Sequence, residues 1–121
     1  MANMKVLIVD DSKTDRFVLS EMLRKNGYEV FTAENGTEAL SKADDVQPDI
    51  ILMDVVMPGT SGFQATRSIS KHERTKHIPI IICSSKGQET DKIWGLRQGA
   101  REYLVKPVTE ADLLQKISAL T

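Results

Sequence analysis

The sequence has little cysteine, few aromatic residues and no long hydrophobic run. Its single cysteine, Cys83, cannot form an internal disulfide, which fits a reducing compartment. No apolar segment approaches the ~20 residues that a membrane-spanning helix requires. The first residues lack the apolar segment and small-residue cleavage site of a secretory signal. The sequence therefore predicts a cytoplasmic protein that does not insert into a membrane.

An excess of charge of one sign is also missing. Sixteen basic and seventeen acidic residues give a formal net charge of -1, whereas nucleic-acid binders carry a basic excess. We therefore expect no nucleic-acid partner. A composition that is 40% hydrophobic and 27% charged is typical of a globular protein and excludes collagen and disordered chains. The length of 121 residues predicts one domain, 1–121, with no second module.

Short apolar segments recur along the chain and predict β-strands. The first, third and fourth are nearly continuous runs of Val, Ile and Leu, which are typical of strands covered on both faces of a parallel sheet. The second and fifth are weaker, which predicts positions near the edges of the sheet. The predicted strands are Lys5–Val9, Glu29–Ala33, Asp49–Met53, Ile80–Cys83 and Glu102–Val105.

Longer segments with helical spacing of apolar residues separate and follow these strands. Ile93 and Leu96 provide the expected core positions of the fourth segment, and Thr109 is the expected N-cap of the last. The strand–helix order, repeated along the chain, predicts an α/β domain with a doubly wound parallel sheet and helices on both faces. The predicted helices are Lys13–Asn26, Gly36–Val46, Ser61–Glu73, Gln88–Gln98 and Thr109–Leu120.

Polar residues follow most of the predicted strands. Asp10 and Asp11 follow the first strand, Asp54 the third, Ser84 the fourth and Lys106 the fifth. Because ligands bind beyond the carboxyl ends of parallel strands, these side chains are expected to converge. Close carboxylates repel one another until a hard cation such as Mg²⁺ neutralises them. A carboxylate beside that cation and a lysine can attack phosphorus, which predicts a phosphoryl-transfer site.

Each of these residues also has a simpler interpretation when it is taken alone. Asp10 and Asp11 precede a predicted helix, so either could be a cap or turn residue. Ser84 alone would be a turn hydroxyl, and Lys106 alone would be a solvated side chain. The joint pattern at successive strand ends favours the functional interpretation.

Four motifs resemble the receiver domain of bacterial two-component response regulators in its stand-alone, CheY-like form. The resemblance extends over the chain in the order of the family. It implies the flavodoxin-like sheet order 2-1-3-4-5, with strands numbered along the chain. It also implies a signalling protein without an output domain, which accepts phosphate but is not an enzyme. The motifs are Val6–Ser12, Asp54–Pro58 with Gly62, Ile78–Ser84 and Tyr103–Pro107.

The resemblance assigns roles to the residues at the strand ends. Asp54 matches the phospho-acceptor, and Asp11 matches the residue that binds Mg²⁺ directly. Asp10 matches its neighbour, which contacts the metal through water. Val56 matches the position whose backbone carbonyl completes the metal site, and its apolar side chain argues against fast self-dephosphorylation. Lys106 matches the lysine that contacts the phosphate.

Further positions match the residues that transmit phosphorylation in the family. Ser84 matches the switch hydroxyl, Tyr103 the switch aromatic residue, and Pro107 the family's cis-proline. The stretches Gly62–Arg67 and Gln88–Gly95 are similar to PilH-type regulators of type IV pilus chemosensory systems. This similarity implies control of twitching motility or taxis.

The implied partners are proteins. A histidine kinase of a chemosensory system would donate the phosphoryl group to a monomeric receiver. A motor or adaptor protein would then bind the face formed by the fourth helix, fifth strand and fifth helix, or the protein would only drain phosphate from the kinase.

Two alternatives stay open from the residues alone. A Mg²⁺-dependent phosphohydrolase with an aspartate nucleophile would need a cap, for which the chain is too short, and a D-x-D motif after the first strand, which is missing. A flavodoxin-like FMN binder would need a hydroxyl-rich and glycine-rich loop after that strand. The segment Asp10–Ser12 would instead repel a phosphate in the absence of a cation.

Overall fold

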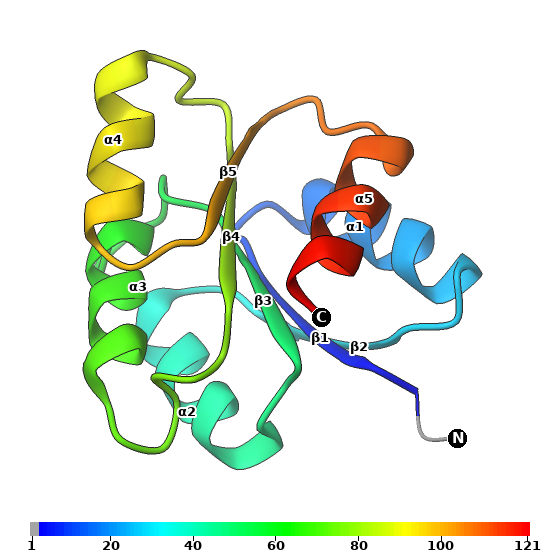
Figure 1. Cartoon of the computed structure of the whole chain (residues 1–121), viewed down its shortest axis with the longest axis horizontal. Helices are drawn as coiled ribbons and strands as arrows, with labels where there is room; N and C mark the ends of the chain where they lie inside the picture. Colours follow the sequence, from blue (N-terminus) through cyan, green and yellow to red (C-terminus); the bar gives the residue numbers. More distant parts are fainter. Residues whose placement is uncertain (1–2) are drawn as a thin grey trace.

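The computed structural model describes residues 3–121, in which β-strands and α-helices alternate (Figure 1). Each predicted element is present, and its ends lie within two residues of the prediction. The strands are β1 (Lys5–Val9), β2 (Glu29–Ala33), β3 (Ile50–Met53), β4 (Ile80–Ser84) and β5 (Glu102–Val105). The helices are α1 (Lys13–Lys25), α2 (Gly36–Val46), α3 (Gly62–Lys71), α4 (Glu89–Arg97) and α5 (Glu110–Leu120).

The described strands form one parallel sheet in the order β2-β1-β3-β4-β5. This order confirms the predicted doubly wound, CheY-like architecture, with the weaker strands β2 and β5 at the edges. Helices α1 and α5 cover one face of the sheet, and α2, α3 and α4 lie on the other (Figure 1). Since β1 pairs with β3 and Val9 lies opposite Met53, the residues that follow these two strands are neighbours.

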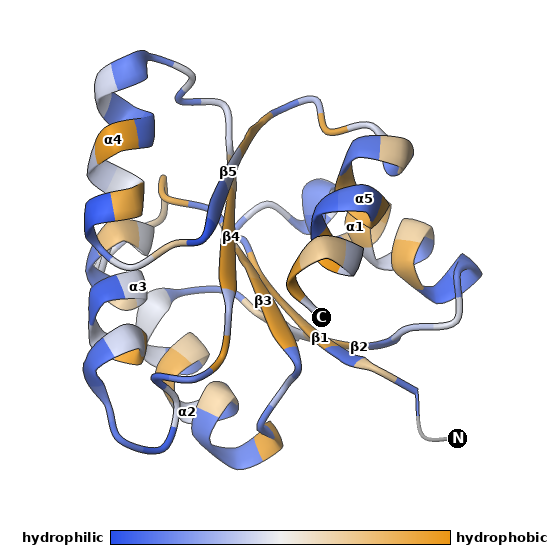
Figure 2. Ribbon diagram, viewed as in Figure 1, coloured by the Kyte–Doolittle hydropathy of each residue, from blue (hydrophilic) through white to orange (hydrophobic). Residues whose placement is uncertain are grey.

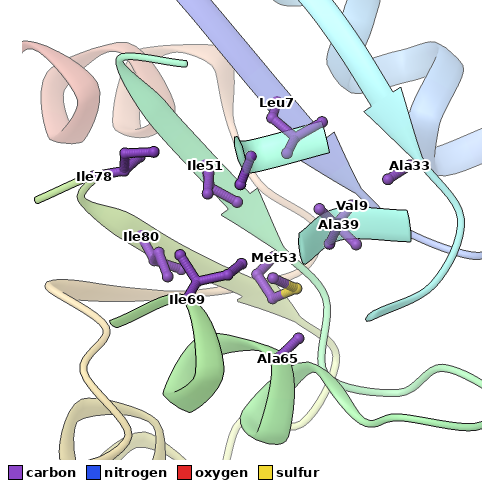
Figure 3. Close-up of a cluster of buried hydrophobic side chains, with 11 residues drawn as sticks. Leu7, Val9, Ala33, Ala39, Ile51, Met53, Ala65, Ile69, Ile78 and Ile80 are labelled. Carbon is purple, nitrogen blue, oxygen red and sulfur yellow. The ribbon is translucent and has the colours of Figure 1, made fainter. Parts of the chain in front are cut away.

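Two hydrophobic layers hold the helices to the sheet. Figure 2 shows that β1, β3 and β4 are hydrophobic along most of their length, as strands covered on both faces must be. On one face, the strands pack against small and apolar residues of α2 and α3 (Figure 3), including Ala39, Ala65 and Ile69. On the other face, they pack against α1 and α5 through Leu19, Leu23, Leu113 and Ile117.

The fourth helix is where the predicted core is wrong. Ile93 and Leu96 were expected to face the core, but they are 45% and 48% exposed. Helix α4 instead buries Gly95, and the C-cap residue that follows it, Gln98, is also buried. A Cβ atom at Gly95 would lie 2.7 Å from Ile82 Cδ1 and 3.0 Å from the Tyr103 ring, so the glycine allows a close approach of α4 to the sheet. None of the helices in residues 3–121 is long and apolar enough to cross a membrane.

A second glycine fixes helix α3 beside the strand ends. A Cβ atom at Gly62 would lie 1.9 Å from the backbone carbonyl oxygen of Asp54, so no side chain fits there. The Gly62 N–H donates to the Val55 carbonyl at 3.2 Å, and the Ser61 hydroxyl caps the helix in a capping box with Gln64. The start of α3 is thereby held against the segment that follows β3.

Candidate acidic site at the carboxyl ends of the strands

Three carboxylates meet where β1 and β3 end. Oxygen atoms of Asp10, Asp11 and Asp54 lie within 4.8 Å of one another. Asp10 and Asp54 are buried, whereas Asp11 is exposed. The pairing of β1 with β3 continues past the strands, because the Asp54 N–H donates to the Val9 carbonyl at 2.9 Å. The predicted convergence of these carboxylates is therefore present in the structure.

Local hydrogen bonds orient the two buried carboxylates. Asp54 Oδ1 accepts from the Val55 N–H at 2.7 Å, which leaves Oδ2 facing the ammonium group of Lys106 at 3.4 Å. Asp10 Oδ1 accepts from the N–H of Ser12, the N-cap of α1, at 2.9 Å. The turn role of Asp10 and its contact with Lys106 are thus compatible, because the turn uses Oδ1 and Lys106 contacts Oδ2.

Lys106 binds carboxylates from three parts of the chain. Its Nζ lies 2.7 Å from Asp10 Oδ2, 2.7 Å from Asp15 Oδ2 and 3.4 Å from Asp54 Oδ2. Burial works to lower the pKa of Lys106, but the bonds to Asp10 and Asp15 and the charge of Asp54 outweigh it and raise this pKa. Burial also raises the pKa of Asp10, against the lowering effect of the bonds from Lys106 and Ser12.

Two residues of α1 that the sequence analysis did not single out support the site. Asp15 binds Lys106, and the Arg16 guanidinium donates to the backbone carbonyl of Asp10 at 2.7 Å. The available signal was helical spacing, because Asp15 lies four residues after Asp11 at the start of α1. That spacing alone does not show that Lys106, 91 positions away, lies beside it.

Ser84, the last residue of β4, and Tyr103, within β5, contact one common residue. Ser84 is buried, and its Oγ accepts from the Lys86 N–H at 3.2 Å. The Tyr103 hydroxyl donates to the Lys86 carbonyl at 2.5 Å. Burial is the main cause of a raised pKa at Tyr103. The loop that follows β4 is therefore fastened by both side chains.

The remaining predicted residues flank the acidic cluster. The Val56 side chain is half exposed, and the Val56 N–H approaches Asp54 Oδ1 at 3.4 Å. The peptide bond between Lys106 and Pro107 is cis, as the resemblance implies.

The donor set fits a hard divalent cation. Asp10, Asp11 and Asp54 offer only oxygen ligands, and together with Asp15 they outnumber the one ammonium group of Lys106. Mg²⁺ prefers oxygen ligands and keeps several waters, so a few carboxylates at an open edge suffice. Buried carboxylates without full compensation are costly, and a bound cation would relieve that cost.

Comparison with known proteins identifies the family that this fold and site define. The family model of the response regulator receiver domain matches residues 6–118, and the chain belongs to this family of two-component signalling proteins. It is thus a signalling domain and not a member of a catalytic enzyme family, so neither the phosphohydrolase nor the FMN-binding alternative is retained.

Relatives of known sequence or structure agree with this assignment. The chain is 53% identical to Protein PilH of Pseudomonas aeruginosa over 116 residues, which are 96% of each chain. Its fold is similar to that of chemotaxis protein CheY4 of Vibrio cholerae, with a TM-score of 0.93, 37% identity and coverage of 99% and 100% of the two chains.

A second solved structure bears on the acidic cluster. The receiver domain of sensor histidine kinase PA1611 from Pseudomonas aeruginosa has a TM-score of 0.91, 32% identity and coverage of 98% of both chains. That structure has a magnesium ion coordinated in its active site cleft.

Proposed function

We propose that this receiver accepts a phosphoryl group from a histidine kinase on Asp54 in a Mg²⁺-dependent reaction. The observation that carries the proposal is the placement of Asp54. Its Oδ2 faces Lys106 Nζ at 3.4 Å, and its carboxylate lies within a three-carboxylate cluster. The receiver domain of PA1611, which holds magnesium in its active site cleft, supports the same interpretation of the cluster.

The proposed reaction is a displacement at phosphorus. A carboxylate oxygen of Asp54 attacks the phosphorus of phosphohistidine, the P–N bond breaks, and the imidazole leaves with the electron pair and takes a proton from solvent. Lys106 offers its positive charge to the phosphoryl oxygens. Asp11, Asp54 and the Val56 carbonyl would hold Mg²⁺, with Asp10 contacting it through water, and the ion would supply charge neutralisation for the transferring group.

Ser84 and Tyr103 are the proposed switch residues. A phosphoryl oxygen on Asp54 would accept a hydrogen bond from the Ser84 hydroxyl, and the side chain would turn away from the Lys86 N–H, from which its Oγ accepts in the structure, to make that bond. Loss of that bond would loosen the loop whose Lys86 carbonyl accepts from Tyr103. The consequence would be a rearrangement at α4, β5 and α5, where a motor or adaptor protein would bind.

Similarity to PilH supports a narrower proposal about the pathway. Because the chain covers 96% of PilH at 53% identity, we place it in type IV pilus motility or taxis, as a single cytoplasmic receiver domain that acts as a monomer. It would either switch a partner or drain phosphate from a chemosensory kinase. Transfer rates from each histidine kinase of the source organism would identify the donor, and equal rates from all kinases would contradict a dedicated pathway.

Intact-mass measurement tests the central reaction. Incubation with Mg²⁺ and acetyl phosphate should add one phosphoryl group to the wild type, and none to Asp54→Asn or to the wild type in EDTA. Equal labelling of Asp54→Asn would contradict the assignment. Mg²⁺ should also raise the melting temperature by binding the folded state. Asp11→Asn should remove most of that rise, and a full rise in this variant would refute the metal site.

A further inference from the structure

We propose that Asp15 is a positioning residue that holds the Lys106 ammonium group in a resting contact and thereby slows phosphorylation of Asp54. This inference rests on the proposed function, and it adds a residue that limits the reaction. Lys106 Nζ lies 2.7 Å from Asp15 Oδ2, closer than the 3.4 Å that separates it from Asp54 Oδ2. The Lys106 ammonium group is therefore held by the Asp15 carboxylate of α1 while it faces the Asp54 carboxylate, which is the proposed nucleophile.

The number of donors on Lys106 makes an exchange necessary. An ammonium group has three N–H donors, and Asp10, Asp15 and Asp54 accept from Lys106 in the structure. A phosphoryl oxygen can therefore gain a hydrogen bond from Lys106 only when one of these contacts is weakened. Phosphorylation of Asp54 thus requires Lys106 to give up one partner.

Burial indicates which partner is given up. The Asp10 side chain is 2% exposed, so its charge would lose an ion pair without gaining water. The Asp15 side chain is 42% exposed, and water can replace the ammonium group there. Asp54 is the residue that receives the phosphoryl group, and it stays within reach of Lys106. Of the two shorter contacts, at 2.7 Å each, the one to Asp15 is consequently the less costly to exchange.

Asp15 is not needed to cap its helix through its carboxylate. Its backbone N–H, and not its side chain, donates to the Ser12 hydroxyl at 3.2 Å. The carboxylate is therefore free to bind Lys106, and it competes there with the anionic group that Lys106 must contact. Removal of its charge should strengthen the attraction of Lys106 for the donor.

A matched pair of substitutions isolates the effect. Asp112 occupies the same position in α5 that Asp15 occupies in α1, and its backbone N–H donates to the Thr109 N-cap hydroxyl, also at 3.2 Å. Within residues 3–121, Asp112 makes no ion pair. Asp15→Asn and Asp112→Asn therefore remove the same charge from the same helical position, but only the first touches Lys106.

The first measurement is the initial rate of phosphorylation by acetyl phosphate at saturating Mg²⁺, followed by intact mass over a range of donor concentrations. In this reaction an Asp54 oxygen attacks phosphorus, the bond to the acetate oxygen breaks, and acetate leaves with the electron pair. Asp15→Asn should raise the rate per unit donor concentration by about two- to five-fold, the scale of a partly exposed ion pair. Asp112→Asn should match the wild type. An unchanged or lower rate in Asp15→Asn would overturn the proposal.

A second pair of variants tests whether the effect passes through Lys106. In a Lys106→Met background, Asp15→Asn should change the already lowered rate no more than Asp112→Asn does. If Asp15→Asn still accelerates the reaction there, the carboxylate acts by repelling the donor, and the positioning role is wrong.

Carbon NMR of the lysine side chain, without metal or donor, separates failure of this inference from failure of the proposed function. Asp15→Asn should shift the Lys106 Cε resonance, and Asp112→Asn should not. If the Lys106 Cε chemical shift is the same in Asp15→Asn as in the wild type, the resting contact is refuted, whether or not Asp54 is phosphorylated. Absence of labelling in the wild type would instead refute the proposed function.

Discussion

The interiors of β1, β3 and β4 and the carboxyl ends of the same strands are both buried, yet their chemistry is opposite. The interiors consist of apolar residues such as Ile8, Leu52 and Ile81, which pack between two helical layers. Directly after the last residues of the strands, the chain places the buried Asp10 after β1 and the buried Asp54 after β3. Burial by itself therefore does not distinguish the structural part of the sheet from its functional part.

The difference lies in what can replace each contact. A packed leucine in the interior has no alternative partner of equal value, so its position is fixed. The Lys106 ammonium group has three carboxylate partners at the strand ends, and a cation or phosphoryl oxygen can replace one of them. The stability of the fold should thus come mainly from the interior of the sheet, and the response to a cation or a phosphoryl group from the carboxyl ends of the strands. The following substitutions test this division.

The largest loss of stability should follow from truncation in the interior. Leu52→Ala removes a fully buried side chain and should lower the free energy of unfolding by about 2–5 kcal/mol. Leu96→Ala makes the same truncation on the exposed surface of α4 and should change it by about 0.5 kcal/mol or less. Urea unfolding of both variants provides the comparison. Equal losses would show that α4 packs more tightly than the structure indicates.

Removal of Lys106, at the carboxyl ends of the strands, should cause the second largest loss of stability. Lys106→Met leaves Asp10 and Asp54 without their ammonium partner, and it should cost about 1–3 kcal/mol in metal-free buffer. Lys116→Met breaks the partly exposed pair with Glu102 and should cost about 0.5 kcal/mol or less. Mg²⁺ should stabilise Lys106→Met more than the wild type, because the cation meets uncompensated carboxylates. A smaller gain would contradict the charge balance described for this site.

A smaller loss of stability, with a specific loss of response, is expected at Ser84. Ser84→Ala leaves the Lys86 N–H without its Ser84 acceptor and should cost about 1 kcal/mol. The variant keeps the carboxylates, so it should still accept a phosphoryl group. Amide NMR shifts of residues 84–106 and the fluorescence of Trp94 should respond to phosphorylation in the wild type and not in Ser84→Ala. Identical responses would show that another group couples Asp54 to α4.

The smallest effect on stability at ordinary pH should come from ionisation of Cys83, within β4. Burial raises the pKa of Cys83 from 9.0 to about 12, so the folded state keeps the neutral thiol while the unfolded chain ionises. The stability due to this group is fully present below pH 9 and falls as the pH rises toward 12. Below pH 9, unfolding curves of wild type and Cys83→Ala should therefore keep a constant difference. The thiol of the folded wild type should also resist disulfide reagents, and rapid labelling would refute its burial.

The parts of the site that the sequence predicts are those fixed by topology. Once the strand order is set, Asp10, Asp11, Asp54 and Lys106 must meet, because they follow strands whose carboxyl ends share one edge. Asp15 was missed because its contact with Lys106 joins a helix to a distant loop, and helical spacing does not reveal such a neighbour.

Helix α4 shows the same limit of prediction from helical spacing. Apolar spacing placed Ile93 and Leu96 toward the core, whereas α4 approaches the sheet through Gly95. Periodicity shows which residues share a face of a helix, but the fit against Ile82 and Tyr103 decides which face is buried. For a glycine-mediated contact, hydrophobicity gives no signal.

The most direct test of the account is to locate the phosphoryl group chemically on the wild-type chain. After reaction with Mg²⁺ and acetyl phosphate, borohydride reduces an aspartyl phosphate to homoserine, which peptide mass spectrometry assigns to one position. We expect homoserine at position 54 alone, with none in EDTA and none when the Mg²⁺-loaded protein is treated without donor. Homoserine at position 10, 11 or 15, or equal amounts with and without Mg²⁺, would contradict it.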